Sequence, residues 1–227
     1  MQAAIMSSIH DNIQNIRTGL SSEVCLVAVS KTKPDELLME AYTANQRIFG
    51  ENKVQELVGK YERLPKDIEW HMIGHLQRNK VKYIAPFVRL IHGVDSIKLL
   101  QEINKRAVQN DRIIDVLLQM HIAKEESKFG FDQNEVKQFL SSAGFQTLKN
   151  VKVRGLMGMA TFTEDEAIVA KEFNGLKSLF DALKEDFFSD TSDFDILSMG
   201  MTGDYKIALA SGSNMIRIGS AIFGARN

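Results

Sequence analysis

The chain has 227 residues, of which 44% are hydrophobic, and a net charge of −1 at pH 7. This size and apolar content suit one large α/β domain, with two small domains as the alternative, and the balanced charge argues against a nucleic-acid binder. The single cysteine, Cys25, excludes an internal disulfide framework, and we find neither a signal peptide nor an apolar run long enough to cross a membrane. We therefore expect a soluble protein of the cytoplasm.

Apolar residues recur at helical spacing near the start of the chain. Ile5, Ile9, Ile13, Ile16 and Leu20 would share one face of a helix over residues 1–20. The polar face is hardly basic, which argues against a membrane-surface helix. The spacing therefore predicts an amphipathic leader helix that packs against the rest of the protein.

From residue 25 onward, short apolar segments alternate with amphipathic helical segments. The predicted strands are 25–31, 47–51, 69–74, 88–94, 115–122, 151–159, 194–199 and 215–218. The predicted helices are 34–44, 53–63, 77–85, 98–110, 133–143, 164–187 and 204–210. Eight strands alternating with helical segments predict a single (β/α)8 TIM barrel over residues 1–227. A doubly wound open sheet is the alternative, although no dinucleotide fingerprint follows the first strand.

Lys31 stands where the first predicted strand runs into a loop that ends at Pro34. Proline cannot continue a strand ladder and suits the first turn of a helix. Because burying an ammonium group is costly, a half-buried lysine tends towards the neutral amine, which is a nucleophile for aldehydes. The alternative is that Lys31 and Lys33 both point into solvent beyond the strand.

Other unusual residues also follow predicted strands. In a barrel, the carboxyl ends of all strands lie on one face, where functional residues gather. We therefore expect one cluster from the residues at these exits, which are Lys31, Asn52, His75, Asp95, the turn 199–204, and Arg217 with Gly219 and Ser220.

The seventh and eighth exits have the composition of a phosphate-binding cradle. Gly200 and Gly203 flank the hydroxyl of Thr202 just before a predicted helix. Gly219 and Ser220 supply a further amide and hydroxyl. Exposed amides and helix N-termini bind phosphate, and barrels place this site at these two loops. Ordinary turns are the alternative, since glycine is common at strand ends.

Two further features leave alternatives open. Arg217 lies inside an apolar strand, so its guanidinium requires either a carboxylate in a structural ion pair or an acceptor on a ligand. His71 and His75 are four residues apart, but their segment has the character of a strand. No third ligand stands at a fitting spacing, which argues against a zinc site.

Six segments, taken in order from about residue 25 to the C-terminus, resemble the YggS/PROSC proteins, which are the pyridoxal 5'-phosphate (PLP) homeostasis proteins. The segments are VAVSKTKP (27–34), FGEN (49–52), WHMIGHLQRNK (70–80), RGLM (154–157), LSMGM (197–201) and RIGSAIFGAR (217–226). The resemblance implies one barrel like the N-terminal domain of alanine racemase, preceded by an extra helix.

The resemblance also implies a cofactor site. In it, Lys31 holds PLP as a Schiff base, and Arg217 faces the pyridine nitrogen. Thr202 and the backbone of Gly219 and Ser220 take the phosphate. Thr202 stands where the family usually has serine and Ser220 where threonine is common, and both keep the hydroxyl. The other residues implied for the site are Asn52, His75, Ser198 and Met201.

The partner of the ring nitrogen decides what such a site does. A carboxylate would keep the nitrogen protonated and make PLP a strong electron sink, whereas a charged arginine disfavours protonation. We therefore predict a monomeric cytoplasmic carrier that binds PLP reversibly and delivers it to apo-enzymes, with little or no turnover. A PLP-dependent amino-acid racemase is an alternative, but racemases of this fold also use a tyrosine from a partner's extra domain, for which this chain is too short. A cofactor-free class I aldolase is another, although its lysine usually lies on a later strand.

Overall fold

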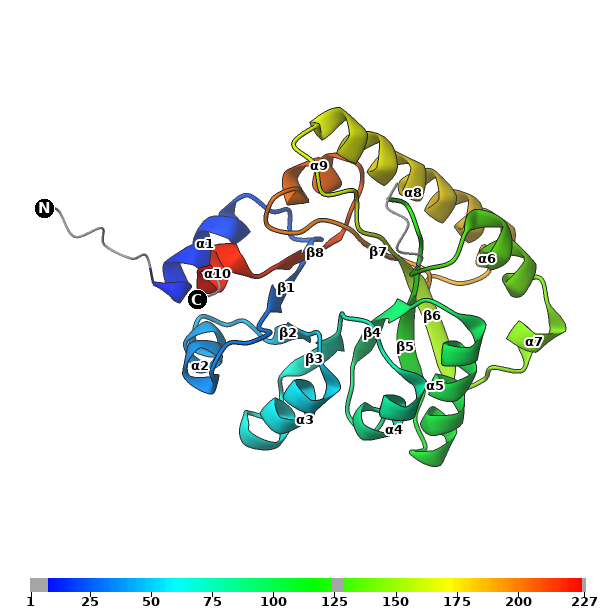
Figure 1. The fold of residues 1–227 in the computed structure, drawn as a ribbon, viewed down its shortest axis with the longest axis horizontal. Helices are drawn as coiled ribbons and strands as arrows, with labels where there is room; N and C mark the ends of the chain where they lie inside the picture. Colours follow the sequence, from blue (N-terminus) through cyan, green and yellow to red (C-terminus); the bar gives the residue numbers. More distant parts are fainter. Residues whose placement is uncertain (1–7, 124–128, 226–227) are drawn as a thin grey trace, which may run out of the picture.

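Eight parallel strands close into a barrel in the computed structural model, which describes residues 8–123 and 129–225 (Figure 1). Strands adjacent in the chain pair with one another, and β1 (Cys25–Val29) pairs with β8 (Met215–Ile218) to complete the ring. The others are β2 (Ile48–Glu51), β3 (Glu69–Met72), β4 (Leu90–Val94), β5 (Ile114–Gln119), β6 (Val151–Met157) and β7 (Ile196–Ser198). The predicted TIM barrel is confirmed, and the open-sheet alternative is wrong.

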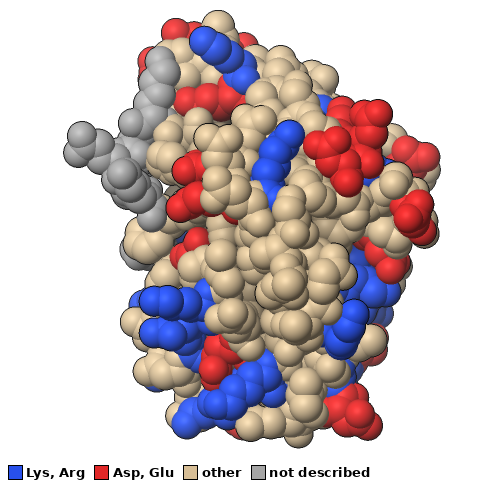
Figure 2. Space-filling model, turned by 90° about the vertical axis from the view of Figure 1, so that its right-hand side faces the viewer, with Lys and Arg blue, Asp and Glu red and all other residues tan. Residues whose placement is uncertain are grey.

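Helices surround the ring of strands. They are α1 (Ile9–Thr18), α2 (Asp35–Thr43), α3 (Val54–Arg63), the 3-10 turn η1 (Arg78–Lys80), α4 (Val81–Ile84), α5 (Ile97–Gln109), α6 (Gln133–Leu140), α7 (Ala143–Gln146), α8 (Glu166–Phe187), α9 (Tyr205–Ala210) and α10 (Ser220–Phe223). Within residues 8–123 and 129–225, no helix has both the length and the apolar character needed to cross a bilayer. On the face that Figure 2 shows, basic and acidic side chains are interspersed.

Three helical segments differ from the sequence predictions. The predicted helix 77–85 begins as η1, and only four residues of α-helix follow before Pro86, which has no backbone N–H to continue the helix. The predicted helix 133–143 ends at Leu140, and α7 begins separately where Ser142 Oγ accepts a hydrogen bond from the backbone N–H of Phe145. The short α10 was not predicted, because four residues carry no helical period.

The strands separate two apolar layers. Every second residue of a strand points into the barrel, and the others point towards the helices. The interior layer consists of Val27, Leu90, Leu117, Met157 and Met215, with Cys25, Ile48, Ile73 and Ile196 packed against it. The alternate residues, such as Phe49 and Trp70, belong to the larger core between strands and helices. This alternation decides which side chains at the strand ends face the barrel axis.

The leader helix α1 lies against α2 and α10. It begins at a cap in which Ser8 Oγ accepts from the N–H of Asp11, and its apolar stripe of Ile9, Ile13 and Ile16 is buried. The Asn12 side chain donates to the carbonyl oxygen of Ile222 at 2.9 Å. The predicted amphipathic helix is present over the described residues, and Ile5 lies outside them.

Candidate functional site

The predicted site residues all lie at the carboxyl ends of strands. Lys31 comes two residues after β1, Asn52 directly after β2, and His75 three residues after β3. The remainder are Ser198 at the end of β7, Met201 and Thr202 in the turn before α9, Arg217 within β8, and Gly219 and Ser220 directly after it. Because parallel strands of a closed barrel end at one rim, these residues share one end of the molecule.

Strand alternation sets the directions of the residues that lead up to Lys31. Val27 belongs to the interior layer, so Val29 falls on the barrel side, and Lys31 follows two residues later in the turn after β1. Ser30, with the opposite parity, is turned to the outside, where its Oγ donates to Glu51 Oε1 at 2.6 Å. The Lys31 side chain is half-buried.

Arg217 begins a chain of hydrogen bonds that crosses the barrel interior. Its Nη1 donates to Ser198 Oγ at 2.5 Å, and its Nη2 donates to the carbonyl oxygen of Gly158 at 3.1 Å. Ser198 Oγ also lies 3.2 Å from His92 Nδ1, and His92 Nε2 lies 3.0 Å from His71 Nδ1. We call Arg217, Ser198, His92 and His71 the inner chain. It joins β8, β7, β4 and β3.

Burial sets the charges of the inner chain. Arg217 is only 4% exposed, and desolvation lowers its pKa to about 10, which still leaves a cation at neutral pH. Burial lowers the pKa of His71 to about 3 and the pKa of His92 well below its usual value, so both rings are neutral. Among the described residues, the hydrogen-bond partners of Arg217 are a hydroxyl and a carbonyl, no carboxylate lies within ion-pair distance of it, and Asp204 attracts the cation from further away. The structural ion pair considered for Arg217 is therefore not formed within this part of the chain.

The turn between β7 and α9 is held by a carboxylate. Asp204 Oδ1 accepts a hydrogen bond from the backbone N–H of Met201 at 2.6 Å, which closes the turn around Thr202. Gly200 has a φ of 90°, and a Cβ there would lie 2.8 Å from the Cα of Tyr205. Only glycine fits this position. Asp204 thus shapes the predicted phosphate turn, a role that the sequence did not reveal.

The β7 turn lies beside β8, and the turn after β8 lies beside the exit of β1. The backbone N–H of Arg217 donates to the carbonyl oxygen of Gly200 at 3.0 Å. Gly219 approaches β1 so closely that a Cβ on it would lie 3.3 Å from the carbonyl oxygen of Val29. The loop that carries Lys31 and the predicted phosphate turns are therefore neighbours, although they come from opposite ends of the sequence.

His75 and His71 have separate environments. His75 lies on the rim with its Nδ1 3.0 Å from Asp95 Oδ2, and its ring centroid is 4.9 Å from that of Phe129. His71 is buried within the inner chain. In the described parts of the chain, no three His, Cys, Asp or Glu side chains are arranged to hold a metal ion.

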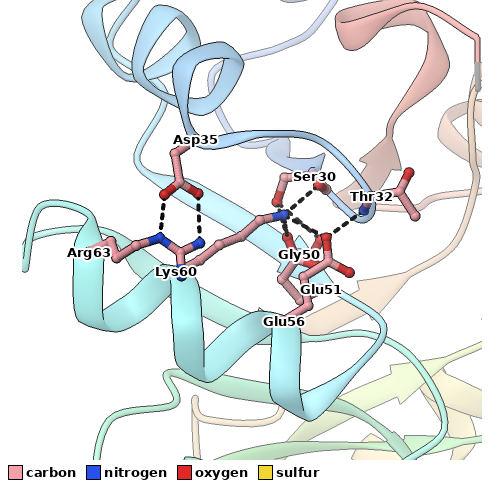
Figure 3. A network of polar contacts seen from close by, with 8 residues as sticks. All are labelled: Ser30, Thr32, Asp35, Gly50, Glu51, Glu56, Lys60 and Arg63. Atoms are coloured by element: carbon pink, nitrogen blue, oxygen red, sulfur yellow. Dashed lines mark hydrogen bonds and ion pairs between the residues drawn. The ribbon is translucent and has the colours of Figure 1, made fainter.

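A second polar network, which the sequence analysis did not predict, lies outside β1 and β2 (Figure 3). Lys60 of α3 is 2% exposed, and its Nζ donates to Glu51 Oε1 at 2.7 Å, Glu56 Oε1 at 2.8 Å and the carbonyl oxygen of Ser30 at 2.8 Å. Burial raises the pKa of Glu51, and the attraction of Lys60 partly opposes this. We call Ser30, Glu51, Glu56 and Lys60 the outer network.

Comparison with known proteins reveals the relatives of this barrel. The family model described as the N-terminal domain of alanine racemase matches residues 6–227. A pyridoxal phosphate homeostasis protein of Aquifex aeolicus is 40% identical over 202 residues, which cover 88% of this chain and 86% of that protein. One of Vibrio alginolyticus is 39% identical over 98% of this chain and 99% of its own length. This chain belongs to the pyridoxal phosphate homeostasis protein family. The resemblance found in the six sequence segments is confirmed.

Solved structures extend the comparison. PipY of Synechococcus elongatus PCC7942 with PLP bound has a TM-score of 0.88 and 32% identity, covering 96% of this chain and 100% of that one. The same protein without PLP has a TM-score of 0.90. An alanine racemase of Clostridium difficile 630 matches with a TM-score of 0.78 at 15% identity, over 97% of this chain and 60% of the racemase. This chain thus shares the fold of the racemase barrel.

Proposed function

We propose that this chain binds PLP as a Schiff base on Lys31 and serves intracellular PLP homeostasis, with little or no turnover. The observation that carries this proposal is the inner chain, which presents a buried guanidinium without a carboxylate partner among the described residues. Such a group suits an uncharged ring nitrogen, which accepts a hydrogen bond. The PLP-bound structure of PipY, at 32% identity, supports the choice of ligand.

The other rim residues have the chemistry that this ligand requires. Lys31 would supply the amine, and Arg217 would donate to the ring nitrogen. The hydroxyl of Thr202 and the backbone of Gly219 and Ser220 would hold the phosphate, because amides and hydroxyls bind anions well. The side chains proposed to line the rest of the pocket are Asn52, His75, Ser198 and Met201.

The charge of Arg217 favours carriage over catalysis. When bound, PLP supplies an electron sink, which is strongest while its ring nitrogen is protonated. A cation beside that nitrogen disfavours the proton. We therefore propose one domain that acts as a cytoplasmic monomer, buffers PLP and passes it to apo-enzymes. The names of the relatives, which refer to homeostasis, support this role.

An absorbance spectrum of the purified protein tests the proposal. We expect a Schiff-base band that borohydride abolishes, and peptide mapping should find the reduced adduct on Lys31. Lys31→Ala should lose the band. Lys33→Ala is the matched control, because the Lys33 ammonium instead donates to the carbonyl oxygens of Phe223, Gly224 and Ala225. An adduct that persists on another residue of Lys31→Ala would contradict the assignment.

Racemisation of an amino acid is the second candidate, favoured by the fold that this chain shares with alanine racemase. It requires removal and return of the proton on the substrate Cα. We expect no exchange of the Cα hydrogen of alanine or serine with solvent deuterium when the protein is present at substrate concentration. Exchange that follows the amount of protein, and that Lys31→Ala abolishes, would favour the racemase instead.

A further inference from the structure

The backbone that carries Lys31 forms a tight turn. The N–H of Lys33 donates to the carbonyl oxygen of Ser30 at 3.0 Å, so Lys31 and Thr32 are the two central residues. Thr32 has a φ of 64°, whereas Lys31 is not among the residues with positive φ. This is the pattern of a type II turn, in which glycine or asparagine usually occupies the position of Thr32. A β-branched residue is disfavoured there, so surrounding contacts have to hold the turn.

Both peptide groups that flank Lys31 are bound by side chains of α3 (Figure 3). On one side, Lys60 Nζ donates to the carbonyl oxygen of Ser30 at 2.8 Å. On the other side, Glu56 Oε1 accepts from the N–H of Thr32 at 2.5 Å. The two side chains also bind each other at 2.8 Å, one helical turn apart. The Cα of Lys31 is therefore fixed from both directions by one helix.

The outer network is anchored in turn to β2. Glu51, which is fully buried, accepts from Lys60 Nζ at 2.7 Å and from Ser30 Oγ at 2.6 Å. Glu51 ends β2 and immediately precedes Asn52 on the rim. A buried ion pair that also satisfies backbone groups holds one geometry more firmly than a solvated pair. This contact network thus joins the exits of β1 and β2 to α3.

We propose that Glu56 and Lys60 are positioning residues that aim the Lys31 amine at the aldehyde carbon of PLP. This inference rests on the proposed function. In the reaction, the neutral amine adds to the aldehyde carbon to form a C–N bond, and the aldehyde oxygen leaves as water with two hydrogens from the amine. The rate of such a step depends steeply on orientation, and a displacement of about 1 Å can slow it by about a hundredfold. Neither Glu56 nor Lys60 has to touch the ligand.

Rapid-mixing absorbance with the apo-protein and PLP measures this step directly. For Glu56→Ala, we expect the limiting rate of Schiff-base formation at saturating PLP to fall by between about tenfold and a hundredfold. Pyridoxine 5'-phosphate has an alcohol in place of the aldehyde and reports non-covalent binding alone. Its dissociation constant should change less than about twofold, because the phosphate turns and Arg217 are untouched. A general loosening of the fold would instead lower both the limiting rate and the affinity for pyridoxine 5'-phosphate.

Matched variants separate positioning from stability. Glu56→Gln keeps an oxygen that can accept from Thr32, so it should recover most of the limiting rate. Thr32→Gly added to Glu56→Ala should also restore part of it, because glycine adopts the positive φ without the bond to Glu56. Glu62→Ala, an exposed position on the same helix, should leave the rate unchanged. If Glu56→Ala does not fold, Lys60→Met/Glu51→Gln removes the contact to Ser30 without an unpaired buried charge, and it should slow capture similarly.

Each failure has its own signature. If wild-type protein captures PLP on Lys31 and Glu56→Ala captures it at the same limiting rate, the positioning role is wrong and the proposed function stands. Parallel losses of the rate and of pyridoxine 5'-phosphate binding would also overturn positioning in favour of a structural role. If the wild-type protein forms no borohydride-reducible adduct on Lys31, the proposed function itself is wrong.

Discussion

The inner chain and the outer network each contain a buried cation, but the two cations have different hydrogen-bond partners. In the outer network, the ammonium of Lys60 meets two carboxylates, Glu51 and Glu56, at 2.7 and 2.8 Å. In the inner chain, the hydrogen-bond partners of the Arg217 guanidinium within the described residues are a hydroxyl and a carbonyl, and two neutral histidines lie beyond. The two assemblies lie on opposite sides of the strands at the same end of the barrel.

The difference shows what each assembly is suited to do. A buried charge without a counter-ion is costly, and it persists where a ligand or a reaction makes use of it. A buried charge that is already paired with an opposite charge binds a ligand only weakly, but removing one member of the pair is strongly destabilising. The comparison therefore supports the proposals of ligand binding for the inner chain and rigidity for the outer network, and three experiments on stability test it.

The largest effect should come from Lys60→Met. It leaves the carboxylate of Glu51 buried without its cation, so we expect a loss of about 3–5 kcal/mol in the free energy of unfolding, measured by urea denaturation. Adding Glu51→Gln should recover most of this loss, because the amide can still accept from Ser30 Oγ. If Lys60→Met is as stable as wild type, the charge of Lys60 does not stabilise the buried carboxylate of Glu51 as the contacts indicate.

The histidines of the inner chain should make stability depend on pH. Their pKa values are lowered in the folded protein, to about 3 for His71, so below pH 6.5 the unfolded chain binds protons that the folded chain does not. Stability is therefore lost as the pH falls. For His71 alone, we expect a loss of about 2 kcal/mol between pH 7 and pH 5, and His92 adds to it.

Urea denaturation of the apo-protein at these two pH values measures the loss. In His71→Gln/His92→Gln the dependence should flatten, which separates it from the titration of other groups. Glu51 acts in the opposite direction, because its raised pKa lets the folded protein take up a proton first as the pH falls. A pH dependence that is the same in wild type and the double variant would contradict neutral histidines in the folded barrel.

Arg217→Met should have a smaller effect of the opposite sign. Removing a buried cation that forms no ion pair with the described carboxylates should raise the free energy of unfolding of the apo-protein by about 1–2 kcal/mol, or Tm by several degrees. The same change should weaken binding of pyridoxine 5'-phosphate, because the donor proposed for the ring nitrogen is lost. Differential scanning calorimetry without ligand measures the first effect. If Arg217→Met destabilises the apo-protein as strongly as Lys60→Met does, the inner chain and the outer network do not differ in the way proposed.

Much of the fold could be predicted from the sequence because the apolar pattern of each segment agrees with the barrel that the whole chain forms. Each strand is a short apolar run, and the pairing of β1 with β8 follows once eight units are counted. The departures occur where local signals are weak. The four-residue α10 is too short for a period, and the break between Leu140 and Ala143 depends on a cap at Ser142.

The site was predictable only in part. Arg217 stands out in the sequence as a charged residue in an apolar strand. His92 stands out in the same way as a polar residue within β4, but nothing in the sequence pairs His92 with Ser198. Lys60 falls on the buried face of α3 with Val54 and Leu57, three residues apart. That spacing alone cannot tell a solvated lysine from one that binds Glu51, because the partner comes from tertiary packing.

The adjacency of Gly219 and Val29 has a consequence for biosynthesis. A ribosome makes the loop of Lys31 early and the turn after β8 late, yet the two meet only when β8 closes the ring against β1. Under the proposed function, Lys31 therefore lacks the anion-binding turn during translation, and a nascent chain binds PLP only after its last strand has emerged and docked.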